Sequence, residues 1–548
     1  MKFDVILEDH LGPFGTFQKR IFLLLCMPAL FAGLQLLSHV FTLNVPKHRC
    51  ALPGISNDTF TIQGPHHELL LNATIPWTIE KGISVRDPCR IFKENSPMGK
   101  NRSAQECHAW VYDKSIFKNT DVTELNMVCS NSSLRALTNS ILFVGLLCGS
   151  IISGIISDLY GRKHALLSAV ALHLGSGIGT AFSPNFMAFV IFRFFNGASS
   201  IALLISSFVF VMELVGPSKR TLAGIINKLF WCLGLFMVGG LAYLIPDWHH
   251  LQLAISAPVV LLFGFYCFVP ESPRWLLSRG REKEAEKILR QAAHVNGSTL
   301  PDVLFDQDTL DNGPPAKITE MFKSPVLLIR TLIIFFNWFV IIMVFYGLAL
   351  NVDDLVGDIF LNYTIGNIAE VTAIVLCLFL LDKLGRKVLH CGNMLLGGTA
   401  CLATIVPIMY GGQEDEWITA TLAMIGRFGA TDCIIYIFSA ELFPTVVRNS
   451  GIGSSSFSGR VGAIISPHIV SLGAVVGGDF SKAVPLAVFG SLSEVAGILA
   501  LWLPETMHKE LPESINDAKH FGNKMSHHMD HTDESKVQGD NQTSSEQG

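Results

Sequence analysis

A short charged signature occurs twice in this chain, each time where an apolar stretch meets a basic turn. The two copies are Gly154-x-x-x-Asp158-x-x-Gly161-Arg162-Lys163 and Asp382-x-x-Gly385-Arg386-Lys387. Carboxylates one helical turn before arginines can act as a switchable latch, and the glycines permit a tight turn and close helix approach. A charged hinge repeated at the same end of two membrane helices predicts two similar halves that move against each other. This architecture is typical of transporters rather than receptors or enzymes.

Ionisable residues inside apolar segments are costly and mark functional pathways. The candidates are His39, Lys228, Glu370, Asp432, Arg460, His468 and Glu494. Glu370 lies about three turns from Asp382, near the middle of its segment. Arg460 could bind a carboxylate bidentately. An internal Glu370–Arg460 salt bridge without substrate contact is the alternative.

The other ionisable positions have weaker functional interpretations. Lys228 lies about two turns from Arg220, so its side chain could simply snorkel towards the cytoplasm. Glu494 could be a packing partner between helices, and Asp432 and Glu494 are candidate ion-coupling groups. His39 lies close to the outer end of the first segment.

Aromatic residues supply the second part of the predicted binding site. They are Trp338, Phe345 and Tyr346 in one apolar segment and Trp231 in another. Trp338 and Phe345 or Tyr346 are about two turns apart, so they can share one helix face. Aromatic rings hold quaternary ammonium groups with roughly 0.5–2 kcal/mol of cation–π attraction. Packing against lipid or protein is the alternative for each ring.

Hydropathy predicts an all-α membrane protein. The chain of 548 residues is 50% hydrophobic and only 16% charged, and its mean hydropathy is +0.43. A soluble protein would carry about a quarter charged residues. Twelve segments reach the roughly 20 residues needed to span a bilayer. They are 21–43, 134–156, 165–184, 186–211, 223–245, 251–269, 326–349, 358–381, 388–409, 417–439, 452–475 and 482–503. The start lacks a cleavable signal pattern, so we expect the first segment to be retained.

Lysine and arginine orient these segments, because basic short loops face the cytoplasm. The basic residues of alternate loops are Arg162, Lys163, Lys219, Arg220, Lys383, Arg386 and Lys387. Both termini are therefore predicted to be cytoplasmic. The expected parts are a cytoplasmic N-terminus at 1–20, helix one at 21–43, an extracellular loop at 44–133, helices two to six at 134–270, a cytoplasmic interdomain loop at 271–325, helices seven to twelve at 326–504 and a disordered cytoplasmic tail at 505–548.

The extracellular loop is predicted to be cross-linked and glycosylated. It carries four cysteines, an even number in an oxidising compartment, which predicts two disulfides. They are Cys50, Cys89, Cys107 and Cys129, and three pairings are possible. Sequons at Asn57, Asn72 and Asn101 fit the same extracellular placement.

Several motifs resemble a known family. The signature and Arg193-Phe194-Phe195-Asn196-Gly197 mark the major facilitator superfamily, and Pro270-Glu271-Ser272-Pro273-Arg274-Trp275 is shared with sugar porters. More specific are the long cysteine-bearing loop and three motifs, namely Phe14-Gly15-Thr16-Phe17-Gln18, Thr123-Glu124-Leu125-Asn126-Met127-Val128-Cys129 and Ala440-Glu441-Leu442-Phe443-Pro444-Thr445-Val446-Val447-Arg448-Asn449. Nearly the whole chain resembles the organic cation and anion transporters of solute carrier family twenty-two, and it looks similar to the organic cation transporter-like proteins of insects. The second signature departs from the first in having Leu378 where the first has Gly154.

The resemblance implies a major facilitator fold of twelve transmembrane helices in two six-helix bundles with a large extracellular loop. It implies that the signature charges pair with neighbouring helices when the cytoplasmic side is closed. The implied gating residues are Asp158, Arg162, Lys163, Asp382, Arg386, Lys387, Glu213, Glu441, Glu271 and Arg274. Many cation and zwitterion carriers of the family have a carboxylate at the position of Glu370. At the position of Arg460, anion and carnitine-type carriers have arginine, whereas mammalian polyspecific cation carriers have an acid.

The sequence therefore predicts a secondary carrier of small organic cations or zwitterions in the plasma membrane, working by alternating access. An organic anion carrier is the alternative, although the family's anion carriers keep a lysine where this chain has Ile374. A sugar porter or a non-transporting receptor fits less well. No nucleophile–base pair, metal cluster or phosphate loop is present, so we expect no enzyme, cofactor or metal. Nucleic acid is not an expected partner at a net charge of -5. The expected partners are a small organic ion and the lipid bilayer, and coupling to sodium or protons stays open.

Overall fold

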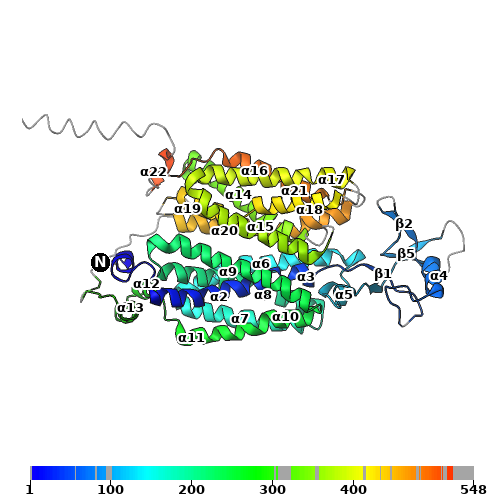
Figure 1. Cartoon of the computed structure of the whole chain (residues 1–548), viewed down its shortest axis with the longest axis horizontal. Coiled ribbons are helices and arrows are strands. Elements are labelled where there is room, and N and C mark those ends of the chain that lie inside the picture. Colours follow the sequence, from blue (N-terminus) through cyan, green and yellow to red (C-terminus); the bar gives the residue numbers. More distant parts are fainter. Residues whose placement is uncertain are drawn as a thin grey trace, which may run out of the picture.

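The computed structural model describes residues 3–521, except 56, 81–82, 94–101, 302–303, 306–321, 352–356, 412–414, 432, 445–446, 477–479, 482, 508, 510–511 and 513–514. Two helical bundles lie side by side, and a lobe of short strands extends from one end (Figure 1). We call this end the lobe end and the opposite one, which carries both charged signatures, the signature end. Asp432, the sequon residue Asn101 and the tail beyond 521 lie outside the described residues.

The first bundle contains the first six predicted segments. Its helices are α2 (Thr16–Leu37), α3 (His39–Thr42), α6 (Ser133–Tyr160), α7 (Arg162–Ala181), α8 (Phe186–Leu214), α9 (Arg220–Leu244), α10 (Trp248–Ser256) and α11 (Phe265–Phe268). The sixth segment is not one regular α-helix, since a 3-10 stretch at Ala257–Gly264 joins α10 to α11. Pro258 near the start of this stretch lacks the N–H that a continuing α-helix needs.

The second bundle contains the other six segments. Its helices are α14 (Pro325–Leu350), α15 (Ile359–Leu384), α16 (Arg386–Ala403), α17 (Ile405–Tyr410), α18 (Glu416–Gly429), α19 (Cys433–Leu442), α20 (Arg448–Val476) and α21 (Ala483–Ala500). Within the described ranges, nine helical stretches are long and apolar enough to cross a membrane. The three predicted segments that are not among these nine are α7, α20 and the broken sixth segment. Helices α7 and α20 are rich in glycine and serine, which suits contact with other helices better than contact with lipid.

The bundles contact each other along two helix pairs, α6 with α20 and α9 with α15. In the first pair, Ser140 Oγ donates to the carbonyl of Ile464 at 2.9 Å. At the lobe end, aromatic rings from both bundles meet: the centroids of Phe41 and Tyr363 are 4.8 Å apart, and those of Tyr243 and Phe360 are 5.4 Å apart. The two bundles are therefore closed against each other at the lobe end.

The strand lobe is the described part of residues 44–132. Its strands form three antiparallel pairs: β1 (His48–Cys50) with β6 (Trp110–Tyr112), β2 (Trp77–Glu80) with β3 (Ile83–Arg86), and β4 (Arg90–Phe92) with β5 (Ala104–Glu106). It also contains helices α4 (Pro65–Thr74) and α5 (Asp121–Glu124). Sequence analysis did not predict these strands. Each pair has only two short strands, and β1 and β6 come from opposite ends of the lobe, so the molecule remains a helical protein.

Two disulfides cross-link the strand lobe, as predicted, and the structure selects one of the three pairings. Cys50 is bonded to Cys107, and Cys89 to Cys129. His48 lies beside the second bridge, but thiols joined in a disulfide offer no thiolate to a metal ion. The sequon residues Asn57 and Asn72 are both exposed.

The strand lobe is attached to the first bundle at the turn between α9 and α10. Glu124 accepts hydrogen bonds from Trp248 Nε1 at 3.0 Å and lies 2.8 Å from His249 Nε2. The backbone N–H of Lys118 donates to the carbonyl of Pro246 at 2.9 Å. The lobe also reaches the second bundle, because the rings of Phe117 and Phe360 are 5.8 Å apart.

At the signature end, short helices cover the bundles. They are α1 (Phe3–Val5), α12 (Pro273–Ser278), α13 (Glu282–Asn296) and α22 (Ile515–His520). The last residue of α13, Asn296, accepts from the backbone N–H of Phe17 at 2.8 Å. The ordered chain continues past the predicted end at 504, because Arg330 of α14 donates to the carbonyls of Ala518 and Phe521.

Candidate functional site

The first charged signature forms a cluster of ion pairs at the end of the first bundle. Arg162 Nη2 lies 2.8 Å from Glu213 Oε1 of α8, and Arg162 Nη1 lies 2.8 Å from Asp158 Oδ1. Glu271 accepts from the backbone N–H groups of Arg162 and Lys163 at 2.9 and 3.1 Å. Its carboxylate thus caps the N-terminus of α7, where negative charge is stabilised. The cluster joins α6, α7, α8 and the chain after α11.

The second signature forms the same cluster in the second bundle. Arg386 Nη1 lies 3.1 Å from Asp382 Oδ1, and Arg386 Nε lies 3.2 Å from Glu441 Oε2. Here Glu505 accepts from the backbone N–H groups of Arg386 and Lys387 at 3.0 and 3.1 Å. Each of the two arginines is thus paired within its own bundle.

Glycine is required at the turn of both signatures. Gly161 has φ of +101° and Gly385 has φ of +87°, a region that other residues rarely adopt. A Cβ atom would also come within 2.4 Å of Glu271 Oε2 at the first turn and within 2.7 Å of Glu505 Oε2 at the second. The turn therefore needs glycine both for its backbone and for the carboxylate that caps the next helix.

Sequence reasoning missed Glu505, although the sequence held a signal for it. Pro504-Glu505-Thr506 after the last segment repeats Pro270-Glu271-Ser272 after the sixth. The hydroxyls repeat as well, since Ser272 donates to Glu213 and Thr506 donates to Glu441. By contrast, the predicted gating residue Arg274 contacts Asp4 of α1 at 3.5 Å, outside the cluster core.

A second repeated feature lies deep in the bundles. Arg193 of α8 donates to Asn139 of α6 at 3.3 Å, and Arg427 of α18 donates to Asn367 of α15 at 2.8 Å. Both arginines are 1% exposed. Sequence analysis took Arg193 only as a motif residue and did not single out Arg427, although both begin an Arg-Phe pair on the fourth segment of their half.

The two deep arginines differ in their acidic neighbours. Glu370 Oε2 lies 3.5 Å from Arg427 Nη2, and both side chains are 1% exposed. Glu370 also accepts from Cys232 Sγ of α9 at 3.9 Å, across the interface between the bundles. Arg193 instead experiences the charge of Asp121 in α5 of the strand lobe.

The alternative interpretation, an internal Glu370–Arg460 salt bridge, is wrong, because Glu370 pairs with Arg427. Arg460 donates to the backbone carbonyl of Ser456 at 3.1 Å and to the hydroxyl of the same residue, one turn earlier in α20. It is half-buried and lies within electrostatic range of the phenol groups of Tyr346 and Tyr436. Arg460 therefore faces a different part of the interior from Glu370.

The four predicted aromatic residues fall into two groups. Trp231 of α9 and Phe345 of α14 lie close to the same cation, since Lys228 Nζ is 5.6 Å from the first ring centroid and 6.0 Å from the second. Tyr346 packs on Phe143 of the first bundle with centroids 4.7 Å apart. These three rings lie where the bundles meet.

Trp338 belongs to the core of the second bundle instead. It is 1% exposed, its Nε1 donates to Ser439 Oγ at 2.8 Å, and its ring packs edge-on against Tyr436. Glu494 also has a partner in its own bundle, because Thr399 donates to it at 2.7 Å. That contact fits the packing interpretation of Glu494.

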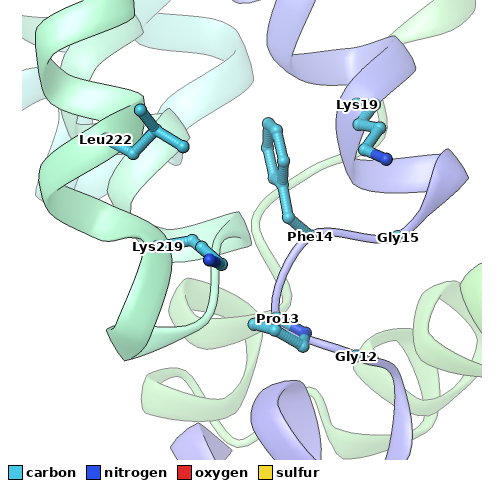
Figure 2. A pocket seen from close by; sticks show the side chains of 7 residues that line it. All are labelled: Gly12, Pro13, Phe14, Gly15, Lys19, Lys219 and Leu222. Carbon is cyan, nitrogen blue, oxygen red and sulfur yellow. The ribbon is translucent and has the colours of Figure 1, made fainter.

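A cavity of about 330 Å³ opens at the signature end, between the start of α2 and the start of α9 (Figure 2). Its lining comprises Gly12, Pro13, Phe14, Gly15, Lys19, Lys219 and Leu222. Figure 2 shows the ring of Phe14 between the two helices, with Lys219 below it. This cavity does not include Glu370 or the deep aromatic rings, which are buried in the interior of the bundles.

Comparison with known sequences identifies a family and close relatives. The profile of the family described as "Sugar (and other) transporter" matches residues 93–515. The chain is 38% identical over 536 residues to the "Organic cation transporter protein" of Drosophila melanogaster, covering 95% of each chain. It is 33% identical over 531 residues to "Organic cation/carnitine transporter 2" of Homo sapiens, covering 92% of each chain.

Solved structures support the fold. The chain is similar to the xylose transporter XylE of E. coli in an inward open conformation, with a TM-score of 0.58 and 16% identity, covering 90% of this chain and 98% of that one. A partially occluded inward open form gives a TM-score of 0.58 at 17% identity, with 90% and 100% coverage. The expected arrangement of twelve helices in two bundles is confirmed.

Proposed function

Because the chain belongs to the sugar and other transporter family of the major facilitator superfamily, and within it to the organic cation transporters of solute carrier family twenty-two, we propose that it carries small organic cations or zwitterions across the plasma membrane. It is a multi-pass membrane transporter and not an enzyme. The relatives named above are an organic cation transporter and an organic cation/carnitine transporter. This chain's own residues narrow the proposal further.

One observation carries the proposal: where the two bundles meet, a buried carboxylate and an aromatic ring, Phe345, both lie next to Arg427. Glu370 is 1% exposed and reaches Cys232 of the opposite bundle. Trp231, adjacent to Cys232, and Phe345 supply the rings. A buried carboxylate compensates an ammonium group, and aromatic faces attract it further, so together they favour an amine substrate.

Arg460 extends the proposed site to zwitterions. Its guanidinium is half-buried on α20, the helix that contacts α6 of the first bundle. A guanidinium pairs with a carboxylate through two parallel hydrogen bonds. A molecule with an ammonium near Glu370 and a carboxylate near Arg460 would engage both groups at once.

The proposed transport cycle follows from two kinds of contact: the signature cluster within each bundle, and the aromatic contacts between the bundles at the lobe end. The aromatic contacts at the lobe end represent a state closed on that side, which the basic loops assign to the outside. In this state the signature clusters are satisfied within each bundle. In the opposite state, we expect their charges to pair between the bundles and to close the cytoplasmic side. Sodium, protons or the membrane potential would supply the driving force.

Uptake in oocytes tests the proposal with three labelled probes: a quaternary cation, carnitine and an aromatic carboxylate. Each probe is measured with the intact protein and with Arg460→Asp, normalised to protein at the cell surface. Arg290→Asp, an exposed arginine on α13, is the control. We expect uptake of the cation and carnitine, with Arg460→Asp abolishing carnitine uptake but sparing the cation.

Two outcomes would contradict this picture. Uptake of the aromatic carboxylate alone would make the protein an anion carrier. Equal effects of Arg460→Asp on the cation and on carnitine would show that Arg460 does not recognise a carboxylate.

A further inference from the structure

We propose that Lys228 is a tethered competitor: its ammonium occupies the cation position between Trp231 and Phe345 in the empty carrier, and a transported cation enters by displacing it. This inference rests on the proposed function, because it assigns the residue that sets charge selectivity in the same site. It gives Lys228 a role beyond snorkelling towards the cytoplasm.

The geometry places the lysine where a substrate ammonium would go. Lys228 Nζ lies 5.6 Å from the ring centroid of Trp231, which is on the same helix, and 6.0 Å from that of Phe345, which is in the other bundle. Both distances fall within the range of cation–π attraction. The two rings are 4% and 5% exposed, so the lysine meets them in a largely dry environment that strengthens the attraction.

The surroundings of Lys228 already hold a second cation. The guanidinium of Arg427 already lies 5.7 Å from the Phe345 centroid, on a ring that Lys228 also contacts. The nearby carboxylate of Glu370 is 3.5 Å from Arg427. A substrate ammonium added beside Lys228 would therefore meet two like charges, and charges repel strongly where water is excluded. Exchange of one ammonium for another keeps the local charge constant.

Lys228 also has a route out of the site. Its residue is half-buried and lies about two turns from Arg220, the first residue of α9 at the signature end. The four-carbon stem of lysine is flexible, and lysine side chains extend along apolar surface to place the ammonium in water. A substrate that takes the aromatic position would thus push the ammonium towards the signature end. The exchange also breaks a contact between the bundles, because Phe345 belongs to the second bundle.

The first test compares Lys228→Met with Lys228→Arg. Methionine keeps the length of the side chain but removes the competing charge, so we expect the KM for a quaternary cation to fall about tenfold in surface-normalised uptake. Arginine keeps the charge and should leave the KM unchanged or raise it. Lys219→Met, on the exposed lysine just before the same helix, is the matched control and should not change the KM. An unchanged or higher KM in Lys228→Met would overturn the proposal; loss of carnitine uptake alone would show that Lys228 binds the substrate carboxylate instead.

The second test does not depend on transport. Purified wild-type protein is treated with an amine-acetylating reagent, with and without the quaternary cation, and the modification of each lysine is read by mass spectrometry. Displacement predicts several-fold faster acetylation of Lys228 when the cation is present and no change at Lys219. Protection of Lys228, or no change, would refute displacement. If the wild-type protein transports none of the probes, the proposed function fails, whereas this labelling still decides the role of Lys228.

Discussion

The two bundles share their charged ends but differ in their centres. At the signature end, Arg162 and Arg386 make corresponding ion pairs, and a carboxylate caps the next helix in each bundle. In the interior, both bundles bury an arginine paired with an asparagine. The acid facing that arginine differs, because Arg427 has Glu370 inside the membrane whereas Arg193 has Asp121 from the strand lobe.

This difference reflects two requirements of a carrier built from similar halves, namely closing and substrate binding. A closing motion of two similar bodies needs the same latch on each of them, so the ends are repeated. A small substrate needs a charged anchor, and among the described residues the buried carboxylate near the aromatic rings, Glu370, lies in the second bundle. The difference can be tested by altering matched residues in the two bundles.

The largest expected effect comes from the deep arginines. Arg427→Leu leaves the Glu370 carboxylate buried without its cation, and breaking a buried ion pair in this way costs about 3–5 kcal/mol. Arg193→Leu, measured at pH 6, leaves the neutral Asn139 without its hydrogen-bond donor. We expect it to lower the free energy of unfolding by about 1–3 kcal/mol. Thermal unfolding in detergent measures both variants.

A double variant checks the cause of this difference. Arg427→Leu with Glu370→Leu removes both charges and should recover much of the stability lost in Arg427→Leu alone. If the two losses simply add, or if both arginine variants lose equal stability, the contrast between the bundle interiors is wrong.

The next prediction concerns Asp121, the acid of the first bundle's arginine. Burial raises the pKa of this carboxyl to about 7, although the charge of Arg193 acts in the opposite direction. Since the folded pKa lies above that of the unfolded chain, the associated stability is present below about pH 4 and is lost as the pH rises through 7. Asp121→Asn should abolish this loss, which corresponds to roughly 4 kcal/mol at pH 8.

Melting temperatures between pH 5 and 8 measure this effect. The wild-type protein should lose stability across the range, whereas Asp121→Asn should change much less. Glu106→Gln, on an exposed carboxylate of β5, serves as the control and should follow the wild type. A wild-type curve that is flat or rises between pH 5 and 8 would show that Asp121 is ionised throughout.

The repeated latch predicts a smaller but symmetric effect. Glu271→Gln and Glu505→Gln each weaken the acceptor for two backbone N–H groups. We expect the maximal uptake rate to fall by roughly tenfold in each variant, about 1.4 kcal/mol, with little change in KM. Surface-normalised uptake at saturating probe measures it. Equal impairment supports one latch in two copies, and impairment in one bundle only would break the symmetry.

The smallest effect separates two aromatic residues of the second bundle that were both predicted to bind substrate. Trp338→Phe removes the hydrogen bond to Ser439 and should lower stability by about 1 kcal/mol without changing the KM for the cation. Phe345→Leu removes a ring near the deep cations and should raise the KM roughly threefold, in line with about 0.5–1 kcal/mol of cation–π attraction. A reversed pattern would move the binding site to Trp338.

Most of the fold could be predicted because membrane helices are recognised in a sequence by their length and hydropathy. In the described residues each of the twelve predicted segments contains a helix, and the signature repeat located both latches. The broken sixth segment was not anticipated, because hydropathy does not report the backbone effect of Pro258. The disulfide pairing was also undetermined, since four cysteines in a loop have no pairing preference that spacing alone reveals.

The sequence indicated residues that lie at the junction of the bundles, but not their contacts, and their role in substrate binding stays a prediction. Glu370, Phe345 and Trp231 were singled out, and they lie where the bundles meet. The pairing of Glu370 with Arg427 was not predicted, because the choice between two arginines depends on helix rotation, which the sequence does not give. Helical periodicity did not reveal that the indole N–H of Trp338 donates to Ser439 inside the second bundle, because that contact depends on the packing of two helices.

The attachment of the strand lobe has a mechanical consequence. Glu124 and Lys118 fix the lobe to the α9–α10 turn, and Cys89–Cys129 ties it to the chain leading into α6, so its anchors belong to the first bundle. We therefore expect the lobe to move together with the first bundle. When the bundles separate on that side, we expect it to move away with the first one, so that the contact between the rings of Phe117 and Phe360 is lost. A clamp from the lobe to the second bundle would then stall the carrier in one state while leaving the binding site untouched.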